Sequence, residues 1–241
     1  VDASGMRTVS SDHVEQVTLD DTGDGGGTGS SSWTLFTSGT AGLVEGTTLN
    51  LRLKTTHADH TQVDLGSGVD TVTAEAIVHP TTVNAGGGSD EFTVGDELAG
   101  IAPGATLTLI GAGGSNTLSL DNTGNAEEPG THVSLARRGE GAGLIRGQTS
   151  GSAYEIAYQD IGGSEATLGP GGDAVTVTHT SSPLTLDTGL GDDHVTVEDA
   201  LHVITVTLDD GNDTLTTTNR HAPIDVKGGY GDDTLIVDRR W

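Results

Sequence analysis

The chain has 241 residues, with 35 acidic side chains against 10 lysines and arginines, so its formal net charge at pH 7 is −25. This acidity argues against nucleic acid or an anionic membrane as a partner, and two tryptophans, three tyrosines and two phenylalanines are too few to stack on bases or sugars. The lack of cysteine excludes disulfides, and no apolar run reaches the length of a membrane span.

In chain order, the first stretch is the least regular. Residues 20–55 include a loop rich in glycine, serine and threonine between Gly23 and Ser32, and we expect irregular coils or loops there. The chain begins with Val1 instead of methionine, so we expect it to be a fragment of a larger, processed protein.

Regular structure is predicted from about residue 60 to 120. Asp70 and Asp90 lie twenty positions apart, and each has a glycine two positions before it and an apolar residue two positions after it. A weaker copy follows at Asn116 after a step of twenty-six. Residues 121–163 then break the period, although 133–136 and 154–158 have the alternation of strands.

The period returns over residues 164–238, where four aspartates recur at intervals of twenty, each two positions after a glycine. Apolar residues occupy every second position on both sides of the last turn: Ile224 and Val226 before it, Leu235 and Val237 after it. This alternation predicts two short strands, each with one buried face. The pattern translates from copy to copy instead of mirroring, so the strands should stack in parallel at about 4.8 Å. A fixed period near twenty residues is typical of solenoids. We therefore predict an all-β parallel β-helix or β-roll, a single elongated body over residues 1–241.

Stacking has an electrostatic consequence for the aspartates. Equivalent carboxylates in neighbouring coils would lie roughly 5 Å apart and repel by about 1 kcal/mol per pair even in bulk water. Ten basic residues cannot neutralise 35 acids. A hard cation held by carboxylate and carbonyl oxygens would supply the missing charge, and calcium suits flexible sites made only of oxygen.

The final turn resembles a known calcium-binding repeat. Residues 228–236, Gly-Gly-Tyr-Gly-Asp-Asp-Thr-Leu-Ile, match the nonapeptide G-G-x-G-x-D-x-U-x of the RTX proteins at every defined position. That family includes secreted bacterial toxins, proteases, lipases and adhesins. The resemblance implies Ca²⁺ as the cofactor, bound between successive coils. The implied ligand residues are Gly66, Gly68, Asp70, Gly86, Gly88, Asp90, Gly171, Asp173, Gly189, Gly191, Asp193, Asp209, Gly211, Asp213, Gly229, Gly231 and Asp233.

The sequence departs from that family in one respect. RTX rolls carry nonapeptides in tandem with two turn motifs per coil, whereas this chain has one motif in each twenty residues. The opposite turns, such as 198–202 and 218–223, are not rich in glycine. We therefore expect the calcium ladder to line a single flank of the solenoid.

The sequence gives weaker signals for a transition-metal site, a glycosidase site or a nucleophile elbow. His57 and His60, on either side of Asp59, are half of a possible transition-metal site, but a surface loop is the better interpretation. The pair Asp192 and Asp193 resembles a glycosidase pair only superficially, since adjacent residues of an extended chain point to opposite faces. We expect the second member to be a ligand and the first a solvated neighbour. No G-x-S-x-G elbow is present.

The expected function is structural, not enzymatic. The sequence favours a calcium-stabilised, adhesive or filament-forming module of a secreted or cell-surface protein. Its expected partners are calcium ions, other copies stacked end to end, or a surface glycan or protein, without membrane insertion. Two alternatives stay open. One is a polysaccharide lyase or epimerase on a β-helix, for which Arg52, Lys54, Arg137 and Arg138 are the candidate cations. The other is a halophilic surface protein whose acids serve solvation only.

Overall fold

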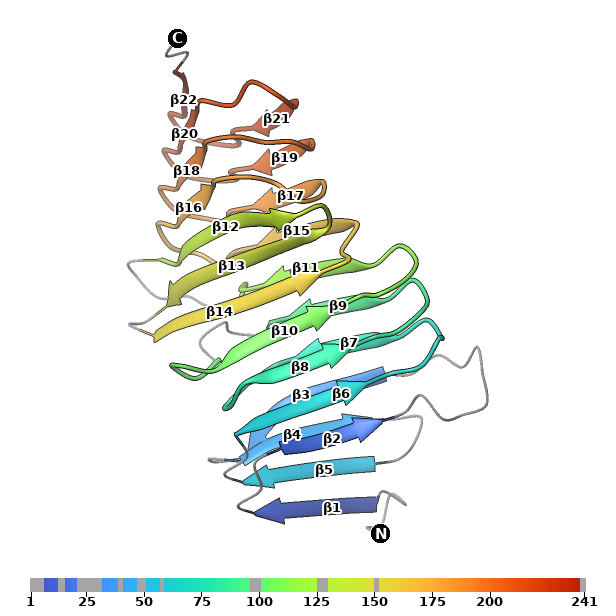
Figure 1. Ribbon diagram of the computed structural model, residues 1–241. Coiled ribbons are helices and arrows are strands. Elements are labelled where there is room, and N and C mark those ends of the chain that lie inside the picture. The colour runs from blue at the N-terminus through green and yellow to red at the C-terminus, as the bar shows by residue number, and fades with distance from the viewer. Residues whose placement is uncertain are drawn as a thin grey trace.

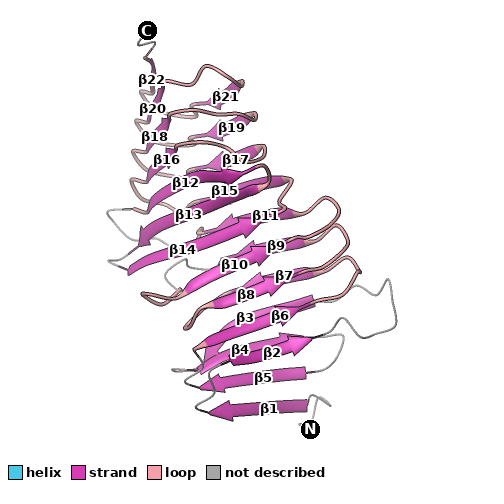
Figure 2. Ribbon diagram, in the orientation of Figure 1, coloured by secondary structure: helices cyan, strands magenta, loops and turns pink. Residues whose placement is uncertain are grey.

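The computed structural model describes residues 7–12, 16–20, 32–38, 41–46, 51–56, 59–95, 101–124, 130–149 and 152–238. Within these ranges the chain forms 22 β-strands arranged in two eleven-stranded sheets (Figures 1 and 2). No described segment is a helix long and apolar enough to cross a lipid bilayer.

The first sheet contains, in spatial order, β1 (Arg7–Asp12), β5 (Leu51–Thr56), β4 (Ala41–Gly46), β3 (Ser32–Ser38), β7 (Thr71–Ala74), β9 (Glu91–Val94), β11 (Thr117–Asp121), β15 (Gly163–Thr167), β17 (Leu184–Asp187), β19 (Ile204–Thr207) and β21 (Ile224–Lys227). The second contains β2 (Gln16–Asp20), β6 (His60–Asp64), β8 (Thr81–Asn84), β10 (Thr106–Ile110), β14 (Ser152–Gln159), β13 (Ala142–Thr149), β12 (His132–Gly139), β16 (Ala174–Val177), β18 (His194–Val197), β20 (Thr214–Thr217) and β22 (Thr234–Val237).

From β15 onward, each strand is followed in the chain by a strand of the other sheet, so each sheet grows by one parallel neighbour at a time. The register pairs apolar residues with apolar residues of the neighbouring strand: Val175 pairs with Val195, and Val195 pairs with Leu215. The predicted all-β fold with parallel sheets of short strands is confirmed, and it is compatible with a β-solenoid.

The hydrophobic core lies between the two sheets. Alternate residues of most strands are buried, as in β18, where Val195 and Val197 are buried and the other two residues are not. Leu186 and Ile204 of the first sheet belong to the same buried cluster as Val195 of the second. Apolar period-two patterning therefore produces one continuous column of side chains along the stack.

Two three-stranded antiparallel segments interrupt the parallel order, β3–β4–β5 in the first sheet and β12–β13–β14 in the second. In each, the last strand of the segment pairs with the earlier part of the sheet and the first strand pairs with the later part. The strands predicted at 133–136 and 154–158 lie within β12 and β14.

Strand β13 between them was not predicted, because its alternation is hidden by glycine. Gly143 is paired with Tyr158, and Gly147 with Tyr154. A Cβ on either glycine would lie within 2.3 Å of the opposing tyrosine hydroxyl oxygen. Each glycine therefore makes room for a buried ring, and the aromatic side chain fills the place of the missing apolar one.

Candidate functional site

The glycine–aspartate turns are closely packed backbone. Two positions before the ladder residue, Gly88 has φ of 144° and Gly231 has φ of 139°, conformations that side chains disfavour. A Cβ on Gly88 would lie 1.7 Å from the carbonyl oxygen of Gly68, and a Cβ on Gly231 would lie 1.7 Å from that of Gly211. Two separate constraints therefore require glycine at this position: the positive φ, and the short distance to the carbonyl oxygen of the preceding turn.

Four positions before the ladder residue, a second left-handed site is less strict. Gly86, Gly189 and Gly229 hold it with φ between 81° and 103°, but in two turns Ala112 and Asp209 adopt φ of 62° and 60°. A left-handed conformation costs a residue with a Cβ about 1–2 kcal/mol. These two positions therefore store local strain.

We expect Ala112→Gly to stabilise the protein by about 0.5–1 kcal/mol, because relief of the left-handed strain exceeds the extra chain entropy that glycine loses on folding. Ala102→Gly is the control, since Ala102 has no positive φ and packs against the core. It should destabilise the protein in urea denaturation followed by circular dichroism. If both variants lowered the free energy of unfolding by the same amount, the left-handed conformation of Ala112 would not be strained.

The ladder side chains of Asp173, Asp193 and Asp213 are buried, and that of Asp233 is exposed. Asp193 Oδ1 accepts a hydrogen bond from the backbone N–H of Asp173 at 2.8 Å, and Asp213 Oδ1 accepts one from Asp193 N–H at 2.8 Å. Asp233 Oδ1 continues the row at 3.2 Å from Asp213 N. Thr131 begins it by donating its N–H to Asp173 Oδ1. These five residues form the second ladder.

The first ladder consists of Asp70, Asp90 and Asn116. Asp70 N–H donates to Asp90 Oδ1, and Asp90 N–H donates to Asn116 Oδ1, both at 2.9 Å. All three side chains are buried. In both ladders, therefore, the backbone N–H of one turn donates to a side-chain oxygen of the next turn, where a regular β-ladder would supply a backbone carbonyl.

The second carboxylate oxygen is the exceptional atom. Oδ2 of Asp90, Asp193 and Asp213 is buried and has no hydrogen-bond partner among the described residues. The Thr188 hydroxyl lies near Asp193, but it donates to the carbonyl oxygen of Leu208 at 3.3 Å. Leaving such an atom unsatisfied costs about 1–3 kcal/mol, and more when the group is charged. Each of these three turns therefore needs a proton or a cation at Oδ2.

The electrostatics agree with this geometry. Burial is the main cause that raises the pKa of Asp193 to about 6; the Thr188 hydroxyl and the Asp173 N–H oppose the rise, and the nearby charges of Asp213 and Asp192 add to it. Burial is also the main cause that raises the pKa of Asp90 and of Asp213. A charged carboxylate here is poorly compensated by the protein alone.

The ligands available to an ion are mostly backbone atoms. No group of three His, Asp or Glu side chains in the described ranges converges on a point that could hold a metal. Stacked turns instead present glycine carbonyls, such as Gly191 O, which would lie 1.9 Å from a Cβ on Gly211. One carboxylate oxygen with several carbonyl oxygens is a hard, oxygen-only donor set, and it fits calcium.

The turns are not equivalent in the room they offer. A Cβ on Gly228, five positions before Asp233, would lie 2.4 Å from Asp233 Oδ2. In other turns the same position holds a buried leucine, as at Leu168 and Leu208. The turn at 228–233, which matches the RTX nonapeptide completely, therefore has no side chain at this position, and the turn at 111–116 shares this feature through Gly111.

The expectation of a single flank is wrong. The turns at Asp70, Asp90 and Asn116 lead from the second sheet to the first, whereas those at Asp173 and onward lead from the first sheet to the second. In the first sheet β7, β9, β11, β15 and β17 all run parallel. Turns that lead into these strands and turns that lead out of them therefore lie at opposite edges of the sheet. The two ladders therefore occupy opposite flanks.

Asp192, which the sequence predicts to be a solvated neighbour, is exposed but also forms hydrogen bonds. Its Oδ1 accepts a hydrogen bond from Asn212 N–H at 2.8 Å and from Asn212 Nδ2 at 3.2 Å, and Asp232 N–H donates to Asn212 Oδ1 at 3.1 Å. Asp193 thus reaches the preceding turn while Asp192 reaches the following one. The recurrence of Asp, Asn and Asp at twenty-residue spacing was the available signal.

The remaining predicted residues have mixed surroundings. Gly66, Gly68 and Gly211 belong to the turns without a left-handed φ, and Gly171 has φ of 138°. Asp209 is half-buried, and burial with the charges of Asp187 and Asp210 raises its pKa. His194 and Asp59 are exposed and His60 is half-buried, while His57 and the side chains of Arg52 and Lys54 lie outside the described residues.

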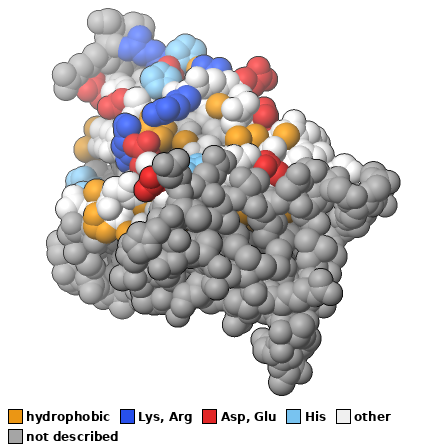
Figure 3. All heavy atoms as spheres, turned by 60° about the horizontal axis from the view of Figure 1, so that its bottom comes forward, with side chains coloured by type: hydrophobic (Ala, Val, Ile, Leu, Met, Phe, Trp, Pro, Cys, Tyr) orange, Lys and Arg blue, Asp and Glu red, His pale blue; other side chains and the backbone are white. Residues whose placement is uncertain are grey.

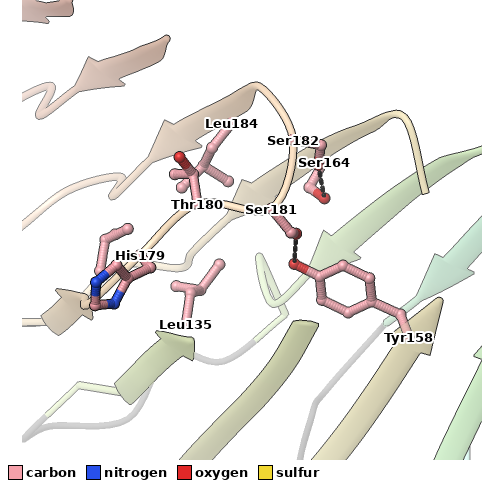
Figure 4. Close-up of a pocket in the computed structure, with 9 residues that line it drawn as sticks. Leu135, Tyr158, Ser164, His179, Thr180, Ser181, Ser182 and Leu184 are labelled. Carbon is pink, nitrogen blue, oxygen red and sulfur yellow. Dashed lines mark hydrogen bonds between the residues drawn. The ribbon is translucent and has the colours of Figure 1, made fainter. Parts of the chain in front are cut away.

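A small pocket lies beside the turn from β16 to β17 (Figure 4). Tyr158 Oη and Ser181 Oγ are 2.8 Å apart, and Ser164 Oγ and Ser182 Oγ are 3.5 Å apart. No carboxylate lines this pocket, so it lacks the acid–base pair of a glycosidase. On the face drawn in Figure 3, acidic, basic and histidine side chains of the described residues are interspersed.

No protein-family model, no curated protein and no solved structure matches the chain.

Proposed function

We propose that this chain is a calcium-stabilised β-solenoid with coils of about twenty residues, similar to RTX repeats, which serves as a structural or adhesive module of a secreted or cell-surface protein. The observation that carries the proposal is the buried carboxylate oxygens without a hydrogen-bond partner in both ladders, Oδ2 of Asp90, Asp193 and Asp213, in turns with closely stacked carbonyls. In this proposal the protein is not an enzyme.

Calcium is favoured over a proton as the charge that completes these turns at neutral pH. The pKa of Asp193, about 6, implies that this carboxylate is mostly ionised at pH 7 in the absence of metal. Ten basic residues against 35 acids leave little counter-charge in the chain. Because the site exists only when turns are stacked, binding of the ion is coupled to folding. A module of this kind would fold in a calcium-rich extracellular medium.

In this proposal the partners are calcium ions, together with other copies of the chain or a surface glycan or protein.

Calcium should raise the stability of the protein. With calcium at about a hundredfold excess over its dissociation constant, each equivalent site adds about 2.7 kcal/mol to the free energy of unfolding. Thermal unfolding followed by circular dichroism, in calcium and in EDTA, measures this difference, with magnesium as the control for simple charge screening. An identical melting temperature in calcium and EDTA would refute the proposed function and leave solvation as the role of the acids.

A further inference from the structure

Asn116 is the only amide among the described residues that form inward rungs of the two ladders. Like the aspartates, it accepts a ladder bond through Oδ1, here from Asp90 N–H at 2.9 Å. Unlike Oδ2 of Asp90, Asp193 and Asp213, its second polar atom is hydrogen-bonded: Nδ2 donates to the carbonyl oxygen of Gly113 at 3.0 Å and to that of Asp160 at 2.9 Å. Both polar side-chain atoms of Asn116 are therefore hydrogen-bonded although the side chain is buried.

The backbone around Asn116 is shaped to receive this amide. The next turn along the stack, residues 160–162, offers no ladder carboxylate, and Gly162 N–H donates to Asn116 O at 2.8 Å. Asp160 adopts φ of 58°, and its backbone carbonyl is the acceptor for Asn116 Nδ2. Gly111 leaves the necessary space, because a Cβ there would lie 2.1 Å from Nδ2.

An aspartate in this place would have the opposite requirement. Its Oδ2 would face the carbonyl oxygens of Gly113 and Asp160 at the distances that Nδ2 now spans, so three oxygens would meet with no donor between them. Such an arrangement is stable only when a proton or a cation lies among the oxygens.

We propose that Asn116 terminates the first ladder without a cation, as an amide rung that persists when calcium is withdrawn, and that it thereby sets how far ion binding extends along this flank. This inference rests on the proposed function, since it takes the aspartate turns to be the ion sites. It follows that the choice of Asn or Asp at an inward rung decides whether that turn depends on calcium.

The test is Asn116→Asp in the full chain. In EDTA at pH 7 we expect its melting temperature to fall by about 5 °C or more, because two hydrogen bonds are replaced by repulsion between oxygens. Calcium should restore most of the loss, and isothermal titration calorimetry with calcium chloride should count one more bound ion than in the wild type.

Asn219→Asp is the matched control. Asn219 also donates Nδ2 to a carbonyl, that of Ala222 at 2.7 Å, and accepts N–H bonds through Oδ1, but its turn lacks the glycine–aspartate motif. It should lose stability equally in calcium and in EDTA. If Asn116→Asp behaves in the same way and binds no additional ion, Asn116 is only a hydrogen-bonding residue and the inference is overturned. A wild type that does not respond to calcium overturns the proposed function instead, which the wild-type titration alone decides.

Discussion

Gly88→Ala is expected to lower the free energy of unfolding by about 3 kcal/mol or more, one of the two largest effects predicted for this protein. Gly88 has φ of 144°, and an added Cβ would lie 1.7 Å from the carbonyl oxygen of Gly68. Alanine would therefore force the two stacked turns apart and weaken the ladder bond between Asp70 and Asp90 beside them. Urea denaturation followed by circular dichroism measures the loss.

The neighbouring glycine is a matched control for this variant. A Cβ on Gly87 would lie 3.7 Å from its nearest neighbour, the Cβ of Ser67, and Gly87 has no positive φ. Gly87→Ala should change the stability by no more than about 0.5 kcal/mol. If the two alanines cost the same, the steric requirement for glycine two positions before the ladder residue does not exist.

The second large effect is a loss of stability with rising pH in the metal-free protein. The pKa of Asp193 is about 6 in the folded state against 3.8 as its ordinary value, so the folded state binds this proton more tightly than the unfolded chain. Its contribution, about 3 kcal/mol at roughly 1.4 kcal/mol per pH unit, is complete below pH 3.8 and is lost as the pH rises through 6.

Denaturation in EDTA at a series of pH values between 4 and 7 tests this dependence. Asp193→Asn should reduce the slope, because an amide at this rung does not titrate; the raised pKa values of Asp90 and Asp213 leave a remainder of the same sign. Calcium at saturation should also flatten the profile, since the ion replaces the proton as the charge that satisfies Oδ2. A metal-free protein that becomes more stable between pH 4 and 7 would show that the buried carboxylate is compensated in another way.

The sequence predicted the structure best where the same residue types recur at the same position of each stacked turn. The glycines two positions before Asp193 and Asp233 lie at turns, and the apolar residues two positions after them are strand residues, because period and alternation reflect stacking directly. The alternation also predicted that Asp192 and Asp193 point to opposite faces, and the structure has Asp193 buried and Asp192 exposed.

The flank of each ladder was not predictable in this way, because it depends on how many strands lie between Asn116 and Asp173. Strand β13 was hidden, since its inward positions at Gly143 and Gly147 are filled by tyrosines from a neighbouring strand. The role of Asp192 was missed for a related reason. A single turn does not reveal whether a carboxylate reaches the turn before it or the turn after it.

The paired rungs at Asp192 and Asp193 also determine how the stack carries a mechanical load. Asp193 holds the N–H of the turn below, and Asp192 holds the N–H of the turn above. A pull along the long axis therefore passes from the turn below to the turn above through two side chains on consecutive residues. The first ladder lies on the opposite edge, so each half of the stack is cross-linked along a different edge.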